Sequence, residues 1–328
     1  MGKKKPSIAP KGETLLYHIK KYDIENLQNM FIEAFDSMFK FAKKRTKLFD
    51  GRKFDVALDE TEIRYFGNRN DPMVVARKKK KAESTRWCFR FITISILNKG
   101  RKFILLTLPV NNFYTVTKYK ICEKMINFAK ERIKINCLFA DRDFSKDSKF
   151  IDLFNRLGVK YCMIGVKTSL MKKTIASAPF LPYPHKDFKI RDVKTNLLIV
   201  ESRKYKFKLK KDDKEEIKRI AIITNINFDY KDKNQIQFWA NKLDEYYKRR
   251  WNIETSFRDS KKFLARTTTK HYEIRYFYWL FAISLYNLWI LAESLLSLAI
   301  YGKILESKTS IKALVFINGL FRAFMEIT

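Results

Sequence analysis

The stretch "CLFADRDFSKDSKFIDLFNRLGVKYCMIGV", residues 137–166, holds two apolar runs separated by a segment with helical periodicity. The runs 137–141 and 160–166 have the length of buried strands, and the segment 146–158 ends at Gly158, a residue type that often terminates helices. Two strands that a helix joins in this way lie parallel in one sheet. The stretch therefore predicts a β-α-β unit and an α/β fold.

Three strand-like segments precede this unit. Residues 54–63, 86–97 and 102–110 are rich in β-branched and aromatic side chains, and the turn Asn-Lys-Gly between the last two predicts a hairpin. Helical periodicity from Lys118 to Asn136 then leads into the parallel unit. We therefore expect three antiparallel strands, followed by a β-α-β-α-β unit with parallel strands.

This is the strand order of a ribonuclease H-like fold, which carries catalytic carboxylates at the ends of its first and fourth strands and on a later helix. Further along, three prolines and several strand-like runs interrupt the alternation of strands and helices. We expect an α/β ribonuclease H-like core interrupted by a β-rich insertion, with helical N- and C-terminal segments. The expected parts are a helical N-terminal segment (1–50), the first part of the core (51–167), the β-rich insertion (168–235) and the helical completion of the core (236–328).

The chain is strongly basic. Its 328 residues include 68 Lys and Arg against 35 Asp and Glu, which gives a formal net charge of +33. Such an excess indicates a polyanionic partner, either nucleic acid or an anionic membrane surface. Aromatic residues make up 15% of the chain, which favours a packed protein over a basic disordered tail. We favour double-stranded DNA as the partner and expect no membrane association.

A long apolar run near the C-terminus could be mistaken for a membrane span. The uncharged run from Tyr276 to Ala292 contains Ser284 and Asn287 and is followed by Glu293, so it predicts a wholly buried core helix. The N-terminal lysines have no apolar stretch behind them, which argues against a secretory signal. The four cysteines are scattered without metal-binding spacing, and we expect reduced thiols. The expected location is the cytoplasm.

Two basic segments each have two interpretations. Residues 77–82, "RKKKKA", form either a solvated loop or a loop that follows the DNA backbone. In residues 204–210 lysines alternate with Tyr205, Phe207 and Leu209, which is typical of an edge strand protected by lysines and equally of a strand that faces DNA.

The glutamate Glu254 lies within the basic stretch "YYKRRWNIETSFRDSKKFL", in a helix predicted over residues 236–264. At about 100° per residue, Tyr247, Arg250, Glu254 and Lys261 fall within a stripe roughly 60° wide. All four side chains can therefore face one site. Taken alone, a glutamate in such a helix pairs more often with an arginine four residues away than with a metal ion.

The four residues of this stripe reproduce the Y-x2-R-x3-E-x6-K signature of DDE transposases, and the chain resembles the insertion-sequence-four-like group of bacterial and archaeal elements. The resemblance extends to "VALDET" (56–61) at the end of the first strand and to "FADRDF" (139–144) at the end of the fourth. It implies that Asp59, Asp141 and Glu254 are catalytic and bind two divalent ions. It also implies DNA cleavage at transposon ends, strand transfer to target DNA, and a homo-oligomer on the paired ends.

The implied chemistry agrees with these residue types. In-line hydrolysis of a phosphodiester needs one cation to generate hydroxide and another to stabilise the leaving 3′ oxygen, and carboxylate oxygens suit Mg²⁺ or Mn²⁺. Arg250 and Lys261 would hold phosphates beside the metals, and Tyr247 would donate a hydrogen bond to the DNA backbone. The alternative is a truncated, catalytically inactive transposase remnant that only binds DNA. A basic membrane-associated protein is a more distant alternative.

Two aspartates compete for the role of metal ligand in "FADRDF". Strand alternation would send Asp141 and Asp143 toward the same face, so alternation alone does not choose between them. Asp141 directly follows the buried run 137–140, whose packing would fix its position, and the family motif also indicates Asp141. We therefore expect Asp141 to be the ligand and Asp143 to lie where the strand gives way to a loop.

Overall fold

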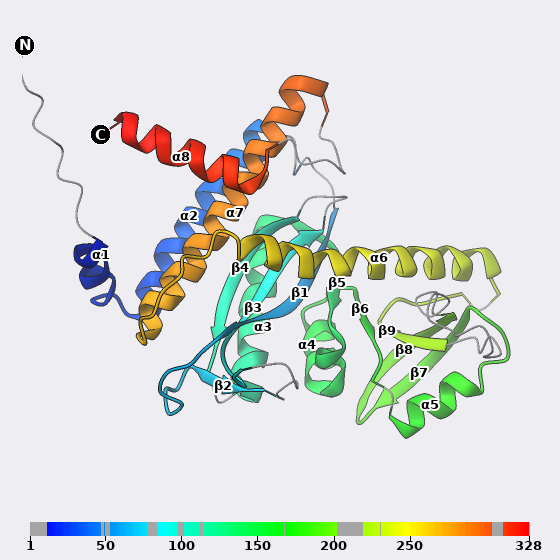
Figure 1. Cartoon of the computed structure of the whole chain (residues 1–328). Helices are drawn as coiled ribbons and strands as arrows, with labels where there is room; N and C mark the ends of the chain where they lie inside the picture. The colour runs from blue at the N-terminus through cyan, green and yellow to red at the C-terminus, as the bar shows by residue number, and fades with distance from the viewer. Residues whose placement is uncertain are drawn as a thin grey trace, which may run out of the picture.

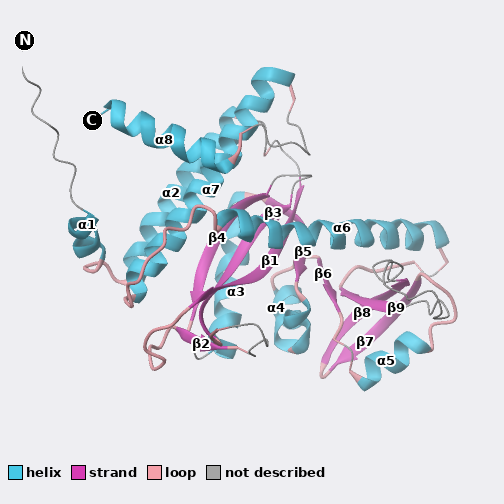
Figure 2. Ribbon diagram, in the orientation of Figure 1, coloured by secondary structure: helices cyan, strands magenta, loops and turns pink. Residues whose placement is uncertain are grey.

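The strand-forming segments join into one mixed sheet surrounded by helices (Figures 1 and 2). The computed structural model describes residues 12–46, 49, 53–77, 84–97, 102–111, 114–166, 168–201, 219–229, 231–303 and 311–327. Within these ranges, only the backbone is described for residues 114–117, 244, 246–255, 321 and 324–327.

The described residues form a nine-stranded sheet with the order β2-β3-β1-β5-β6-β9-β8-β7. The remaining strand, β4, pairs with β3 on the edge opposite β1. The strands are β1 (Lys53–Arg64), β2 (Val74–Ala76), β3 (Trp87–Leu97), β4 (Lys102–Val110), β5 (Lys134–Ala140), β6 (Tyr161–Ile164), β7 (Tyr183–Ile190), β8 (Val193–Glu201) and β9 (Arg219–Thr224).

The pairing of the first strands agrees with the sequence prediction. β3 is antiparallel to both β1 and β4, whereas β5 is parallel to β1 and β6 is parallel to β5. The long crossover through a helix permits the parallel pairing of β1 and β5. After β6 the order departs from a simple parallel sheet, because β9, β8 and β7 extend it in antiparallel fashion. Figure 2 shows these strands and α5 on the side of the molecule away from α2 and α7.

The helices are α1 (Gly12–Ile19), α2 (Ile24–Arg45), α3 (Tyr114–Arg132), α4 (Ser148–Arg156), α5 (Ser169–Ala176), α6 (Lys233–Ser260), α7 (Tyr272–Tyr301) and α8 (Ala313–Ile327), with a 3-10 helix, η1 (Arg142–Lys146). Asp23 caps α2 by accepting a hydrogen bond from the Asn26 backbone N–H, which separates α2 from α1. Gly158 follows α4 with a φ of 63°, the left-handed conformation that ends many helices, as the sequence predicts.

The apolar helix α7 covers the free edge of β4. The side-chain amide of Asn287 accepts a hydrogen bond from the Ile104 N–H (3.0 Å) and donates one to the Ile104 carbonyl (2.7 Å). Trp279 donates its indole N–H to Thr107 of the same strand. The Asn287 contacts occupy backbone groups that an edge strand would otherwise expose, and the Trp279 contact is to the Thr107 hydroxyl. The polar Asn287 in the apolar run is thus explained by strand-edge pairing.

The prediction of a wholly buried helix at α7 is only partly correct. Its most apolar window has the length and composition of a membrane span, and 56% of that window is buried. Phe281, Leu288 and Leu295 are exposed, although α2 packs beside α7 (Figure 1). Most of the helix nevertheless contributes to the core, including Glu293, which is buried.

Several boundaries differ from the sequence predictions. The helix predicted to reach residue 136 ends at Arg132, because β5 already begins at Lys134 beside Lys53. The strands β2 and β7 and the helices α5 and α8 were absent from the predicted elements. The predicted turn 98–100 and the basic segment 204–210 lie outside the described residues, as does the segment 77–82 beyond Arg77.

Candidate active site

The two parallel strands β1 and β5 bring Asp59 and Asp141 together. Leu58 pairs with Ala140 at the end of their ladder, and each aspartate is the next residue of its chain. Neighbouring strands of a sheet lie about 4.8 Å apart, so the two aspartates lie side by side. Both line one cavity of about 620 Å³. The structure therefore unites two of the three predicted catalytic residues.

Asp59 lies within its strand, and the prediction that it stands at the strand's end is wrong. β1 continues to Arg64 through antiparallel pairing with β3, whereas β5 stops at Ala140. The cavity lies where β5 has ended and β1 runs on. Asp59 is 8% exposed, and its Oδ1 accepts a hydrogen bond of 2.8 Å from the Glu60 backbone N–H. A continuous strand thus fixes the position of this carboxylate.

Asp141 is positioned differently, as the N-cap of η1. Its Oδ1 accepts a hydrogen bond of 2.7 Å from the Arg142 N–H, and its backbone has the extended conformation expected of a cap. Because η1 begins at the next residue, strand alternation does not relate Asp141 to Asp143, contrary to the prediction. Asp143 does lie beyond the strand, as expected. It forms an exposed ion pair with Lys146 and also lines the cavity.

The C-terminal end of α6 closes a third side of the cavity through Phe257, Arg258 and Lys261. Glu254 occupies the same helix, three residues before Phe257 and seven before Lys261, and these spacings place all three positions on one side of a helix. The helix α6 therefore carries Glu254 on the same side as two residues that line the cavity. The side chains of Tyr247, Arg250 and Glu254 lie outside the described part of the chain.

The other two carboxylates of the "DETE" run, Glu60 and Glu62, form ion pairs. Glu60 forms an ion pair with Lys118 of α3 and lies 3.6 Å from Arg90. Glu62 accepts a hydrogen bond of 2.7 Å from Arg90, which is its direct cross-strand neighbour, and lies 3.1 Å from Arg77. A metal could bind Glu60 or Glu62 only at the cost of these ion pairs.

Sequence reasoning did not identify Lys118 or Arg90 as residues of this site, and it considered Arg77 only as part of a basic segment that could follow the DNA backbone. Arg90 lies opposite Glu62 only because of the register between β3 and β1, which no local motif encodes. Lys118 reaches Glu60 from a helix that lies 58 residues later in the sequence. The signal available was the acidic run itself, whose charges require partners when the strand is half-buried.

Lys261 lies at the C-cap of α6, just past the helix in which it was predicted. Its ammonium donates a hydrogen bond of 3.0 Å to the Glu62 carbonyl. Although the residue as a whole is exposed, desolvation of this ammonium lowers the pKa of Lys261; the Glu62 carboxylate raises it, and the charges of Arg77 and Arg64 lower it further. Arg64 and Arg77 line the same cavity. A concentration of positive charge therefore lies beside the carboxylates.

The donor set fits a hard divalent cation in part. Asp59 and Asp141 supply carboxylate oxygens from adjacent strands, which are the ligands that Mg²⁺ and Mn²⁺ prefer. Among the described side chains, no group of three or more His, Cys, Asp or Glu is close enough to hold one ion. Glu60, Glu62 and Asp143 also line the cavity, and each of them forms an ion pair with a basic side chain.

Comparisons with known proteins agree with this geometry. A transposase DDE domain model matches residues 53–288, the range that contains both aspartates and α6. No match appears among curated protein sequences. The fold is similar to that of a piggyBac transposase in a synaptic complex with hairpin DNA, with a TM-score of 0.51 and 11% identity over 83% of this chain and 53% of that chain.

The chain therefore spans about half the length of that piggyBac transposase. A Ciona intestinalis endonuclease V in complex with inosine-containing DNA matches at a TM-score of 0.27 and 7% identity, over 58% of this chain and 80% of that one, which is too low to indicate a shared fold. The family match covers well over half of the residues and includes every strand that builds the cavity. The chain belongs to the transposase DDE domain family.

Proposed function

We propose that this protein is a DDE transposase that cleaves DNA at transposon ends in a metal-dependent reaction and joins the exposed 3′ hydroxyls to target DNA. The observation that carries the proposal is the register of β1 and β5, which delivers Asp59 and Asp141 to one cavity beside the end of α6. The family match over residues 53–288 supports it. The spacing of Tyr247, Arg250, Glu254 and Lys261 favours the insertion-sequence-four-like group.

The proposed catalytic core is ribonuclease H-like. The strand order β4-β3-β1-β5-β6 supports this proposal. In it, β3 is antiparallel to β1, whereas β5 and β6 are parallel to β1. In this proposal residues 51–167 form the first part of the core and residues 168–235 form a β-rich insertion that extends the sheet. Residues 236–328 complete the core with helices, and residues 1–50 form a helical N-terminal segment.

We assign Asp59, Asp141 and Glu254 as the catalytic residues and as the ligands of two Mg²⁺ or Mn²⁺ ions. When bound, such ions supply the attacking hydroxide and stabilise the leaving 3′ oxygen. The chain's own contribution is position: β1 fixes Asp59 within a strand, and η1 fixes Asp141 as a cap. Glu60 and Glu62 form ion pairs with basic side chains, so we assign them a structural role rather than a metal-binding one.

The basic wall of the cavity suits the DNA backbone. Arg64, Arg77 and Lys261 come from the ends of β1, β2 and α6, and they lie beside the carboxylates in one cavity. The net charge of +33 supplies the long-range attraction to DNA. We propose that Lys261, Arg250 and Tyr247 contact phosphates, in a homo-oligomer assembled on paired transposon ends in the cytoplasm, without a membrane.

A plasmid-nicking assay tests this function. A supercoiled plasmid that carries the DNA flanking the gene is incubated with protein and Mg²⁺ or Mn²⁺, and DNA binding is measured in parallel by anisotropy. We expect nicking by the wild type, and its loss in Asp59→Asn, Asp141→Asn and Glu254→Gln with binding nearly intact. A wild type that binds but never nicks with either metal would instead be a DNA-binding remnant. Retained cleavage in any one variant would remove that residue from the assignment.

A further inference from the structure

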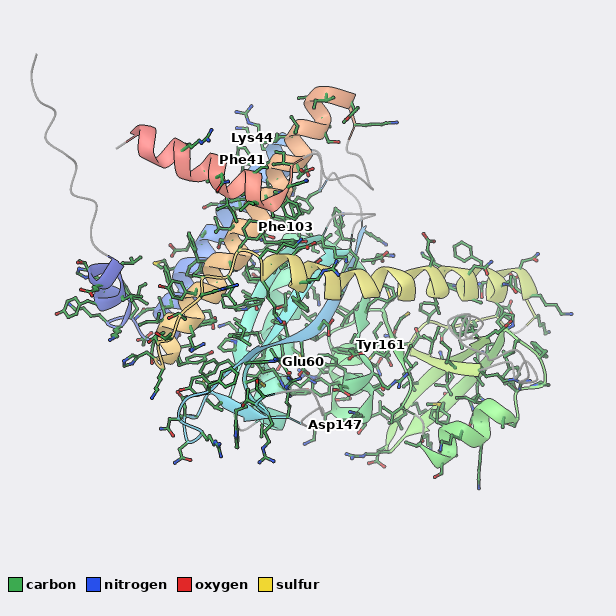
Figure 3. The ribbon with its side chains drawn as sticks, viewed as in Figure 1. Phe41, Lys44, Glu60, Phe103, Asp147 and Tyr161 are labelled. Carbon is green, nitrogen blue, oxygen red and sulfur yellow. The ribbon has the colours of Figure 1, made fainter. Side chains whose placement is uncertain are left out.

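A buried lysine lies beside the proposed metal site without being part of it. The side chain of Lys118, on α3, is only 4% exposed, and its ammonium forms an ion pair with Glu60 Oε1. Glu60, labelled in Figure 3, directly follows Asp59 in β1 and donates its backbone N–H to the Asp59 carboxylate. One contact of Lys118 therefore reaches the residue that orients Asp59.

The same ammonium also reaches the segment that carries Asp141. It lies 4.0 Å from the ring centroid of Phe144, in the geometry of a cation–π interaction, and 5.4 Å from that of Phe150. Phe144 is fully buried, and its backbone N–H donates a hydrogen bond of 3.0 Å to the Asp141 carbonyl. The second contact of Lys118 therefore packs on the turn that Asp141 caps.

The sheet does not supply this connection. Hydrogen bonding between β1 and β5 ends at Leu58 and Ala140, one residue before each aspartate. From that point β1 continues as a strand, whereas the segment after β5 turns into η1. The distance between β1 and η1 therefore depends on side-chain contacts. Lys118 contacts both branches where they diverge.

We propose that Lys118 is a positioning residue that sets the spacing of Asp59 and Asp141, an inference that rests on the proposed function. A metal site needs its ligands held within about 0.5 Å, and this precision comes from the groups that hold the ligands. Lys118 also forms an ion pair with the carboxylate of Glu60. Loss of the lysine releases a competing oxygen ligand one residue away from Asp59.

The test measures metal affinity rather than stability alone. Mn²⁺ binding is titrated by electron paramagnetic resonance in the full chain, for the wild type and for Lys118→Met, which keeps the length of the side chain and removes its charge. We expect the Mn²⁺ dissociation constant to rise about tenfold or more, as for other changes behind metal ligands, while DNA affinity stays within about twofold. Lys118→Arg, which retains a cation, should recover part of the loss. Lys120→Met, on the exposed side of the same helix, is the matched control and should bind Mn²⁺ as the wild type does.

A double variant separates positioning from folding. Lys118→Met removes a buried cation from the half-buried Glu60 and lowers stability, whereas Glu60→Gln/Lys118→Met removes both charges and should restore much of it. A positioning role predicts that the double variant still binds Mn²⁺ weakly. Wild-type Mn²⁺ affinity in the double variant, or in a folded Lys118→Met protein, would overturn the proposal.

One further comparison tells the two proposals apart. Asp59→Asn should lose most Mn²⁺ affinity if the site holds a metal at all. If the wild type and Asp59→Asn bind Mn²⁺ equally poorly, the proposed metal-dependent function fails and the role of Lys118 fails with it. If Asp59→Asn loses affinity while Lys118→Met does not, the proposed function stands and only the role of Lys118 is refuted.

Discussion

Two lysines of this protein, Lys102 and Lys118, are almost equally buried but have different electrostatic surroundings. Lys118 forms an ion pair with Glu60 at the cavity. Lys102, the first residue of β4, is 4% exposed; burial lowers the pKa of Lys102 to about 7, and the attraction of Asp259 in α6 only partly opposes the shift. The comparison shows that a carboxylate in contact accompanies the buried cation at the cavity, whereas burial without such contact shifts the lysine toward its neutral form.

The carboxylates at the cavity also have different contacts. Glu60 and Glu62 form ion pairs with lysine and arginine side chains, and the Oδ1 atoms of Asp59 and Asp141 accept hydrogen bonds from the backbone N–H of the next residue. An ion pair neutralises a carboxylate for structural use. A backbone hydrogen bond orients a carboxylate without placing a formal charge beside it.

The largest expected effect extends this contrast to Asp141 and Asp143, which line the same cavity. Asp143 pairs with Lys146 at the surface, where such a pair contributes at most about 1 kcal/mol. We expect Asp143→Gly to cleave DNA within about tenfold of the wild type, a barrier change under about 1.4 kcal/mol. Asp141→Gly should eliminate cleavage.

The nicking assay checks this prediction, and Asp141→Asn is its control. Asparagine can still cap η1 through its side-chain oxygen, so loss of cleavage in Asp141→Asn would be due to the lost charge rather than to the lost cap. If Asp143→Gly were inactive and Asp141→Gly active, Asp143 would be the metal ligand.

The second prediction tests the pairing at the cavity. Glu60→Ala leaves the Lys118 ammonium buried without its carboxylate, and breaking a buried pair in this way costs about 3–5 kcal/mol. Urea unfolding at pH 7 measures the change. Glu131→Ala, which removes the exposed partner of Arg132, should cost under about 1 kcal/mol and is the control. A loss at Glu60 no larger than that at Glu131 would mean that Lys118 does not depend on its carboxylate.

The third prediction concerns the other lysine and carries a pH dependence. Because the folded-state pKa of Lys102 lies below that of an unfolded lysine, the unfolded state binds more protons between about pH 7 and pH 10. Stability should therefore rise with pH in this window, with a limiting slope of about 1.4 kcal/mol per pH unit from this group. Lys102→Met should be more stable than the wild type at pH 7 and should lose this slope. Equal pH dependence of thermal unfolding in both proteins would contradict it.

The sequence predicted the strand order of the first half of the sheet and the meeting of Asp59 and Asp141. Both follow from local patterns: alternating and continuous apolar runs identify β1, β3, β4 and β5, and the parallel pairing of β1 with β5 then places the two aspartates together. The length of β1 beyond Asp59 was not predicted. It depends on pairing with β3 after β5 has ended, which is a property of the assembled sheet.

The partners of the site residues were not predictable either. The contact between Lys118 and Glu60 depends on how α3 packs, and the placement of Arg90 beside Glu62 depends on register. Asn287 was noted as an interruption of an apolar run, although its function in pairing with the edge of β4 requires the position of α7. Side-chain periodicity predicts the elements, whereas contacts between distant elements decide which charges are neutralised.

The smallest expected effect concerns a third lysine, Lys261, which is intermediate between the other two. Its ammonium has the Glu62 carbonyl as a hydrogen-bond acceptor, while desolvation and the charges of Arg77 and Arg64 lower its pKa. A DNA phosphate at the cavity would provide the anion in contact that Lys118 finds in Glu60. We therefore expect Lys261→Ala to weaken binding to all DNA sequences alike and to reduce the slope of log K against log salt by about one unit.

Fluorescence anisotropy between about 50 and 200 mM salt measures this slope, a range over which each phosphate contact changes affinity detectably. Lys262→Ala is the control, because its ammonium already pairs with Asp259 at 2.7 Å and the residue does not line the cavity. Arg250→Ala should reduce the slope as Lys261→Ala does, if that side chain also contacts a phosphate. An unchanged slope in Lys261→Ala would show that the Lys261 ammonium binds the Glu62 carbonyl and does not contact a DNA phosphate. Within the described residues, contact between a desolvated lysine and an anion at the cavity would then be confined to the pair of Lys118 and Glu60.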